Sequence, residues 1–253
     1  MESNKTEVKK EAAKSNYSPK NYTQSLLENM SERETAIKFR LPDGMKIELT
    51  GSELKAQVAS FADYLLYHEV GKGDIVAGIC GNIPERIYAV LAAHSLGADW
   101  LQLSPHTAPK KLFATLQKYR PRVLVTVENP TDTDEFPAMI NDSFTLIKGV
   151  KQIVVLPAAP PQPGAIKNGR YWNDTFCMTP QPLIFADIDD TQKIYQSPEK
   201  SFTHADFLTE IKSGRVPKEL SFLGLASNRV LALDGRRKKK KKGFFGFFKS
   251  LFD

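Results

Sequence analysis

The chain has 253 residues, of which 41% are hydrophobic and 25% charged, and its formal net charge is +6. This composition is typical of a globular protein and excludes collagen-like and intrinsically disordered chains. No stretch approaches the roughly 20 apolar residues of a transmembrane helix. Residues 1–19 lack the apolar run of a secretory signal peptide. The two cysteines, Cys80 and Cys177, are far apart in the sequence, and we expect no disulfide.

The positive charge is concentrated at one end of the chain. Residues 236–253 hold eight basic residues and one acidic residue, so this tail carries +7 and the remaining residues sum to −1. A nearly neutral body argues against a broad nucleic-acid-binding face, and we expect nucleic acid not to be a partner. The polar residues 1–19 are typical of a disordered arm.

The first element with clear signals is a helix that begins after Thr50. Thr50 and Glu53 have the spacing of a capping box, and apolar residues follow at helical intervals to a predicted end near His68. A glycine-containing turn at residues 71–74 comes next. Residues 75–80 then form an apolar run that predicts a buried strand.

Helices and strands alternate over the next 75 residues. We expect Asn82 to cap a helix that starts at Pro84 and is ended by Gly97, and Thr107 with Pro109 to open another helix. Residues 100–103, 123–127 and 153–156 are further apolar strands. The chain is therefore predicted to be an α/β protein with a mostly parallel sheet and crossover helices, followed by a proline-rich linker or exposed loop at residues 158–163.

Several segments in this region resemble a known family when taken together. The chain is similar to the amino-terminal part of AMP-forming acyl-CoA synthetases, and within that superfamily to acetoacetyl-CoA synthetases. The resemblance rests on residues 21–27, 70–78, 82–85, 95–98, 104–105 and 149–157, together with Trp100. It implies a domain over residues 20–175 with a degenerate continuation over residues 176–235.

The resemblance also implies a chemistry whose central loop is altered in this sequence. Such enzymes form an acyl-adenylate from a carboxylate and ATP and then transfer the acyl group to coenzyme A, using a glycine-rich loop with a lysine to hold phosphates. Residues 189–204 match the flanks of that loop, but its glycines are absent and Glu199 stands at the place of the lysine. We therefore expect no catalytic residue, and ATP, Mg²⁺ and coenzyme A as cofactors only if a second chain completes the enzyme.

A competing interpretation concerns residues 183–191. An apolar run followed by Asp187 and Asp189 resembles the first motif of haloacid-dehalogenase-type phosphatases, in which one aspartate is the nucleophile and the other the general acid near Mg²⁺. This minor alternative requires that residues 183–186 form a strand.

Other polar and aromatic residues give weaker signals. His68, His94, His106 and His204 lack partners at metal-ligand spacing, so we expect no metal site. Trp100 and Tyr195 are expected in the core. Residues 78–82 lie between a strand and a helix, where an anion can bind, but they lack a glycine-rich fingerprint.

The tail combines a basic run with an aromatic segment, a pattern that favours an anionic membrane surface over a partner protein or nucleic acid. On a helix, several of its aromatic residues would share one face. The residues expected to contact the membrane are Arg236, Arg237, Lys238, Lys239, Lys240, Lys241, Lys242, Phe244, Phe245, Phe247, Phe248, Leu251 and Phe252.

The sequence thus predicts a non-catalytic binding or scaffold module with an acyl-CoA-synthetase-like fold, tethered by residues 236–253 to the cytoplasmic face of a membrane. The alternative is a part of an AMP-forming acyl-CoA ligase that a second chain completes.

Overall fold

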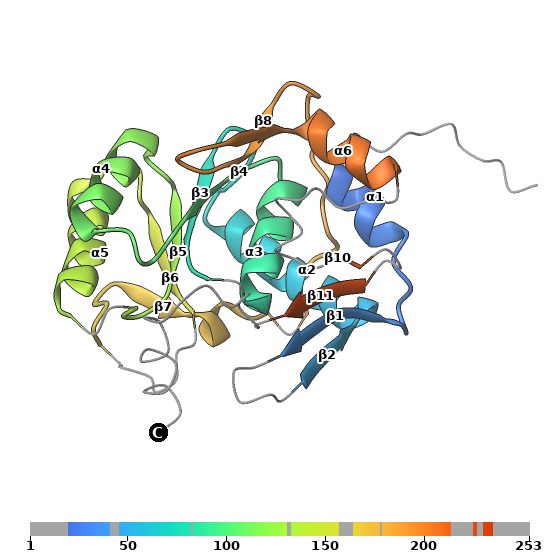
Figure 1. Ribbon diagram of the computed structural model, residues 1–253, viewed down its shortest axis with the longest axis horizontal. Helices are drawn as coiled ribbons and strands as arrows, with labels where there is room; N and C mark the ends of the chain where they lie inside the picture. Colours follow the sequence, from blue (N-terminus) through green and yellow to red (C-terminus); the bar gives the residue numbers. More distant parts are fainter. Residues whose placement is uncertain are drawn as a thin grey trace, which may run out of the picture.

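Seven strands of the chain form one sheet in the computed structural model (Figure 1). In chain order they are β3 (Ile75–Ile79), β4 (Asp99–Leu103), β5 (Val123–Thr126), β6 (Gln152–Val155), β7 (Gly169–Tyr171), β8 (Lys193–Gln196) and β9 (Ser201–Thr203). They lie side by side in the order β7-β6-β5-β3-β4-β8-β9, and every neighbouring pair is parallel except β8 and β9. The predicted mostly parallel sheet is confirmed.

The structure describes residues 20–40, 46–81, 83–130, 133–156, 164–177, 179–213, 225–226 and 230–234. Three expectations lie outside these residues: the arm at 1–19, the linker at 158–163 and the tail at 236–253. Among the described residues, no helix is long and apolar enough to cross a membrane.

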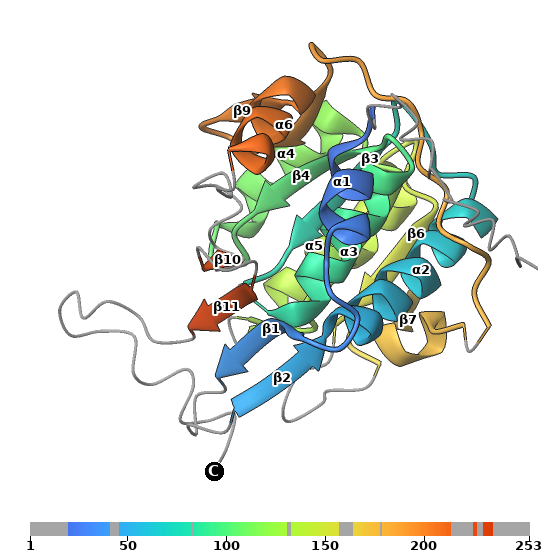
Figure 2. The same ribbon diagram turned by 90° about the vertical axis from the view of Figure 1, so that its right-hand side faces the viewer.

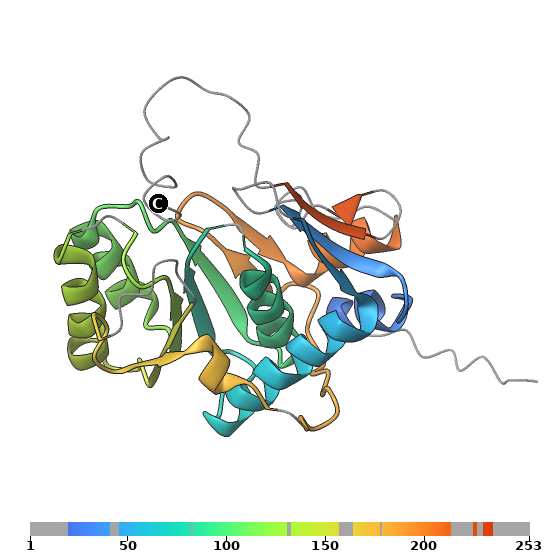
Figure 3. The same cartoon turned by 90° about the horizontal axis from the view of Figure 1, so that it is seen from below.

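Helices cover both faces of the large sheet, as Figure 3 shows. One face carries α2 (Gly51–Tyr67) and α3 (Pro84–Ser95), and the other carries α4 (Pro109–Tyr119) and α5 (Glu135–Leu146). Successive side chains of a strand point to opposite faces of the sheet, so each strand contributes to both layers of the core. On β3, Val76 packs in the cluster of α2 and α3, whereas Ala77 and Ile79 pack in that of α4 and α5. The crossover helices are therefore confirmed.

A second, smaller sheet was not expected from the sequence. It consists of β1 (Thr35–Arg40), β2 (Lys46–Thr50), β10 (Leu225–Ala226) and β11 (Val230–Asp234), in the order β10-β11-β1-β2. Figure 2 shows β1, β2 and β11 side by side, with α2 continuing from β2. The pairing of β1 with β11 is parallel and joins segments almost 200 residues apart.

Three short elements complete the described chain. Helices α1 (Tyr22–Glu28) and α6 (His204–Lys212) contact each other near β8, and the 3₁₀ helix η1 (Trp172–Thr175) follows β7 and contacts α2. The backbone of Gly97 has a φ of +74°, a conformation that favours glycine, directly after the last turn of α3. The predicted terminator of that helix is therefore confirmed.

The helix starts agree with the sequence in one case and differ in two. Thr50 and Glu53 form the expected capping box of α2, with the Thr50 amide 2.7 Å from the Glu53 carboxylate. The N-cap of α3 is Ile83 and not Asn82, and that of α4 is Ala108 and not Thr107. Neither of these two caps has a side-chain hydrogen bond, because the side chains of isoleucine and alanine have no acceptor atom. In both helices a proline occupies the first helical position, where its fixed φ favours the start of a helix.

Candidate functional site

The segment that resembles the adenylating loop is a tight hairpin. Strands β8 and β9 pair antiparallel, with Gln196 opposite Ser201, and residues 197–200 connect them. The Ser197 amide donates to the Lys200 carbonyl oxygen at 2.7 Å, and the Lys200 amide donates to the Ser197 hydroxyl oxygen at 3.1 Å. The two strands therefore remain bonded to each other almost to the tip.

This hairpin offers very little to a phosphate group. A phosphate-binding loop presents several backbone N–H groups to one anion. Here the amides of Ser197 and Lys200 are already used and Pro198 has none, which leaves at most the Glu199 amide in this turn. The exposed Glu199 carboxylate adds a negative charge where a phosphate would approach.

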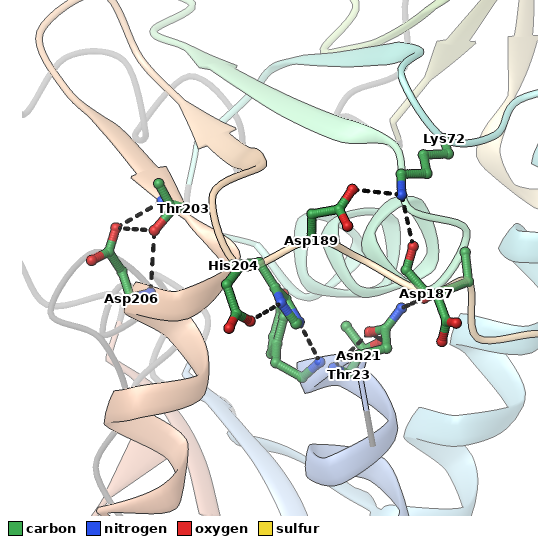
Figure 4. Close-up of polar contacts among 11 residues, drawn as sticks. Asn21, Thr23, Lys72, Asp187, Asp189, Thr203, His204 and Asp206 are labelled. Carbon is green, nitrogen blue, oxygen red and sulfur yellow. Dashed lines mark hydrogen bonds and ion pairs between the residues drawn. The ribbon is translucent and has the colours of Figure 1, made fainter. Parts of the chain in front are cut away.

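Two lysines hold the acidic segment before β8. Lys72 donates from its ammonium group to the Asp189 carboxylate at 2.9 Å and to the Asp187 carbonyl oxygen at 3.2 Å (Figure 4). Lys20 lies 3.7 Å from the Asp187 carboxylate. The Lys72 hydrogen bond and charge lower the pKa of Asp189. Both carboxylates thus take part in surface ion pairs.

The strand expected at residues 183–186 is wrong, because these residues have no regular secondary structure. Their position in the sheet is already taken, since β4 pairs directly with β8. The Ala186 amide donates to the Ser95 carbonyl oxygen, and the Ala186 carbonyl oxygen accepts from Asn21. The phosphatase interpretation of Asp187 and Asp189 therefore lacks the strand on which it depends.

A buried polar cluster joins α1, α3 and α6. Asn21, the N-cap of α1, donates to the carbonyl oxygens of His94 and Ala186, each at 3.0 Å. The neighbouring Tyr22 donates its hydroxyl proton to His94 Nδ1 and its backbone amide proton to His204 Nε2. All four of these polar residues have exposed fractions of 0 or 1%, so this cluster fixes helices and is closed to ligands.

Four of the residues named from the sequence are buried: His94, Trp100, Tyr195 and His204. Trp100 is fully buried and Tyr195 is 7% exposed, which confirms that both lie in the core. Burial lowers the pKa of His94 to about 3 and also lowers that of His204. Within the described ranges, no group of three or more His, Cys, Asp or Glu side chains is arranged to hold a metal ion.

A surface hollow of about 350 Å³ lies between α2, α3 and η1. Burial raises the pKa of Glu85, and burial together with the Glu85 charge raises that of Tyr88. No sequence motif marks the hollow, because its walls come from three separate segments. Its lining residues are Gln57, Glu85, Tyr88, Trp172, Asn173 and Phe176.

Comparison with known proteins gives one family. The family model described as AMP-binding enzyme matches residues 28–195. Similar curated proteins are acetoacetyl-CoA synthetases: that of Xenopus tropicalis is 27% identical over 146 residues, and that of Rhizobium meliloti (strain 1021) is 30% identical over 108 residues. These alignments cover 56% and 43% of this chain but only 22% and 16% of the relatives, so the chain spans about a fifth of their length.

Solved structures show the same fold. An acetoacetyl-CoA synthetase from Streptomyces lividans superposes with a TM-score of 0.59 and 21% identity, covering 69% of this chain and 27% of that protein. The anthranilate CoA ligase AuaEII, solved in complex with anthranoyl-AMP, superposes with a TM-score of 0.60 and 21% identity, covering 77% and 37%. The described residues thus have the fold of the amino-terminal part of these proteins.

Proposed function

The chain belongs to the family of AMP-binding enzymes, and from that premise we propose that it is a non-catalytic binding or scaffold module with the fold of the amino-terminal part of an acyl-CoA synthetase. The observation that carries the proposal is the turn at residues 197–200. It lies between residues that resemble the flanks of the family's phosphate-holding loop, and it leaves at most one backbone amide for a phosphate.

The charges around this turn support the same proposal. Glu199 is exposed at the tip, and Asp190 is exposed in the segment before β8. Asp187 and Asp189 of the same segment are each paired with a lysine and contribute less. Triphosphate and pyrophosphate are polyanions, and their transfer requires groups that stabilise negative charge as it develops. A surface with carboxylates at this edge of the sheet disfavours ATP here.

The second part of the proposal places the module on an anionic membrane surface through residues 236–253. The support comes from the sequence of the tail, in which seven consecutive basic residues directly precede four phenylalanines within a five-residue stretch. Each basic residue near an anionic surface contributes about 1 kcal/mol, and phenylalanine side chains can enter the boundary of the acyl region. A cytoplasmic, membrane-peripheral location is part of this proposal.

The test of lost catalysis is carboxylate-dependent exchange of pyrophosphate into ATP. The purified full chain should stay at background with acetate, acetoacetate and longer acids, while a full-length acetoacetyl-CoA synthetase serves as positive control. Glu199→Lys restores the positive charge but not the missing amides, so this variant should also stay at background. Exchange by the unaltered chain alone would overturn the proposal, and exchange only on addition of a second chain would favour a divided ligase.

A further inference from the structure

The hollow between α2, α3 and η1 combines an acidic group with aromatic walls. Glu85 lies in the first turn of α3, Tyr88 one turn later, and Trp172 on η1. Trp172 is held in place by a stacked contact with Phe61, with ring centroids 4.5 Å apart, whereas Phe176 is 47% exposed at the rim. The walls of the hollow therefore include the fixed indole of Trp172 and the accessible ring of Phe176.

The polar side chains of the hollow have no protein partners among the described residues. The Tyr88 hydroxyl belongs to a residue that is only 5% exposed, yet the structure gives it no hydrogen bond. The side chains of Gln57 and Asn173 line the same space and are likewise without a side-chain bond in the described part of the chain. A hydroxyl without a protein partner beside a cavity is free to bond a polar group that enters the cavity.

The charge of the hollow is negative. Glu85 has no ion-pair partner within the described ranges, and Glu53 on α2 is close enough to act electrostatically on Tyr88 together with Glu85. A half-buried carboxylate without a neighbouring cation favours the binding of one. The faces of Trp and Phe rings also attract cations.

From this geometry we infer that the hollow binds an alkylammonium group. The ammonium donates hydrogen bonds to the Glu85 carboxylate and to the oxygens of Tyr88, Gln57 or Asn173, and the alkyl part packs on Trp172 and Phe176. A volume of about 350 Å³ accommodates one such group with a short chain. The assignment does not depend on whether the chain adenylates carboxylates or binds membranes.

Alkylammonium groups can come from two sources, a free organic amine or a lysine of residues 238–242. Both present the same chemistry to Glu85. The tail follows β11 after Asp234, and Lys242 is eight residues further along the chain, which span at most roughly 29 Å. These lysines can therefore occupy the hollow only if it lies within that distance of Asp234.

Nuclear magnetic resonance of the full chain tests the inference directly. The protein has two tryptophans, so two indole N–H signals are expected, and Trp172→Phe assigns them. Titration with n-butylammonium chloride should shift the Trp172 signal saturably and leave that of Trp100 in place, because the Trp100 indole is buried and donates to Gln102. n-Butanol and sodium chloride are the controls for apolar contact and ionic strength.

Two variants decide which group is responsible. Glu85→Gln should weaken n-butylammonium binding about tenfold or more, as expected for losing a hydrogen bond to a charged group. Glu135→Gln, an exposed carboxylate in the first turn of α5, should leave binding unchanged. No saturable Trp172 shift in the unaltered chain, an equal shift with n-butanol, or unchanged binding in a folded Glu85→Gln variant would each overturn the inference.

A third variant identifies the source of the group. With residues 238–242 changed to glutamine in the full chain, tighter binding of n-butylammonium would show that tail lysines occupy the hollow. Equal affinity in the two proteins would support a free alkylammonium compound as the occupant.

Discussion

The hydroxyl group of Tyr22 donates a hydrogen bond to His94 Nδ1, across 72 residues of sequence. On its other side, His94 donates from Nε2 to the Ile194 carbonyl oxygen at 2.6 Å. These two bonds fix the neutral tautomer of the imidazole, because one ring nitrogen accepts while the other donates. Helices α1 and α3 and strand β8 are thereby joined by a chain of hydrogen bonds that requires an uncharged histidine.

This requirement predicts that the free energy of unfolding falls as the pH is lowered through 6.5. The pKa values of His94 and His204 are lower in the fold than in the unfolded chain, so the unfolded state binds more protons below pH 6.5. Each histidine that remains neutral in the fold should cost about 1.4 kcal/mol of stability between pH 7.5 and pH 5.5. Urea unfolding of the full chain at these two values measures the change.

A comparison of variants isolates the contribution of His94 to this fall in the free energy of unfolding. His94→Gln should reduce the loss between pH 7.5 and pH 5.5 by about 1 kcal/mol. An identical pH dependence in the unaltered chain and in a folded His94→Gln variant would show that the buried imidazole is not kept neutral.

Asn21 should be among the most sensitive polar positions of the chain. Its side chain caps α1 and donates to three carbonyl oxygens, those of His94, Ser95 and Ala186. Asn21→Ala removes the cap and leaves buried carbonyl groups without this donor, so the free energy of unfolding should fall by about 2–4 kcal/mol. Gln24→Ala, an exposed change on the same helix, should alter it by less than about 0.5 kcal/mol. Similar denaturation midpoints for the two variants would contradict the role given to Asn21.

Gly78 is required by the ring of Trp100. A Cβ atom at Gly78 would lie 2.0 Å from Cζ2 of the fully buried Trp100, so an alanine forces the indole to move within a packed core. Gly78→Ala should therefore destabilise the protein by about 1–3 kcal/mol, measured as a lower thermal midpoint. At Gly81 no heavy atom lies within 4 Å of the added Cβ, and Gly81→Ala should change the midpoint very little. If both alanine variants melted alike, the contact of Trp100 with the β3 backbone would not be as described.

The proposed membrane contact has two separable components. Changing residues 238–242 to glutamine should abolish the preference for anionic over neutral vesicles in sedimentation. Changing Phe244, Phe245, Phe247 and Phe248 to serine should leave only binding that salt removes, because screening shortens the Debye length from about 10 Å at 0.1 M to about 3 Å at 1 M. If the unaltered chain stayed in the supernatant with anionic vesicles at low salt, the membrane proposal would fail.

The central part of the fold could be predicted because its signals are local. Strands β3 to β6 are apolar runs, and the start of α2 has a capping box in the sequence. The small sheet could not be predicted, since β1 pairs with β11 near the other end of the chain and long-range pairing leaves no local trace. Helix α5 was not predicted from the sequence either.

The candidate sites were predicted to different extents. The shortened loop at residues 197–200 was evident from the sequence because missing glycines are visible there. The apolar run at residues 183–186 suggested a strand, yet Ile184 is 54% exposed and the direct pairing of β4 with β8 leaves the segment no place in the sheet. The hollow that we infer to bind an alkylammonium group is formed by three segments, and only the fold brings these segments together.

The turn at residues 197–200 also determines how the edge of the large sheet forms. Closing a loop costs entropy that increases with loop length, so a four-residue connection lets β8 and β9 pair at low cost. Hairpins of this kind form within about 1–10 μs. A long glycine-rich loop would remain without a fixed conformation until a ligand ordered it, whereas here the edge of the sheet has its shape without any ligand.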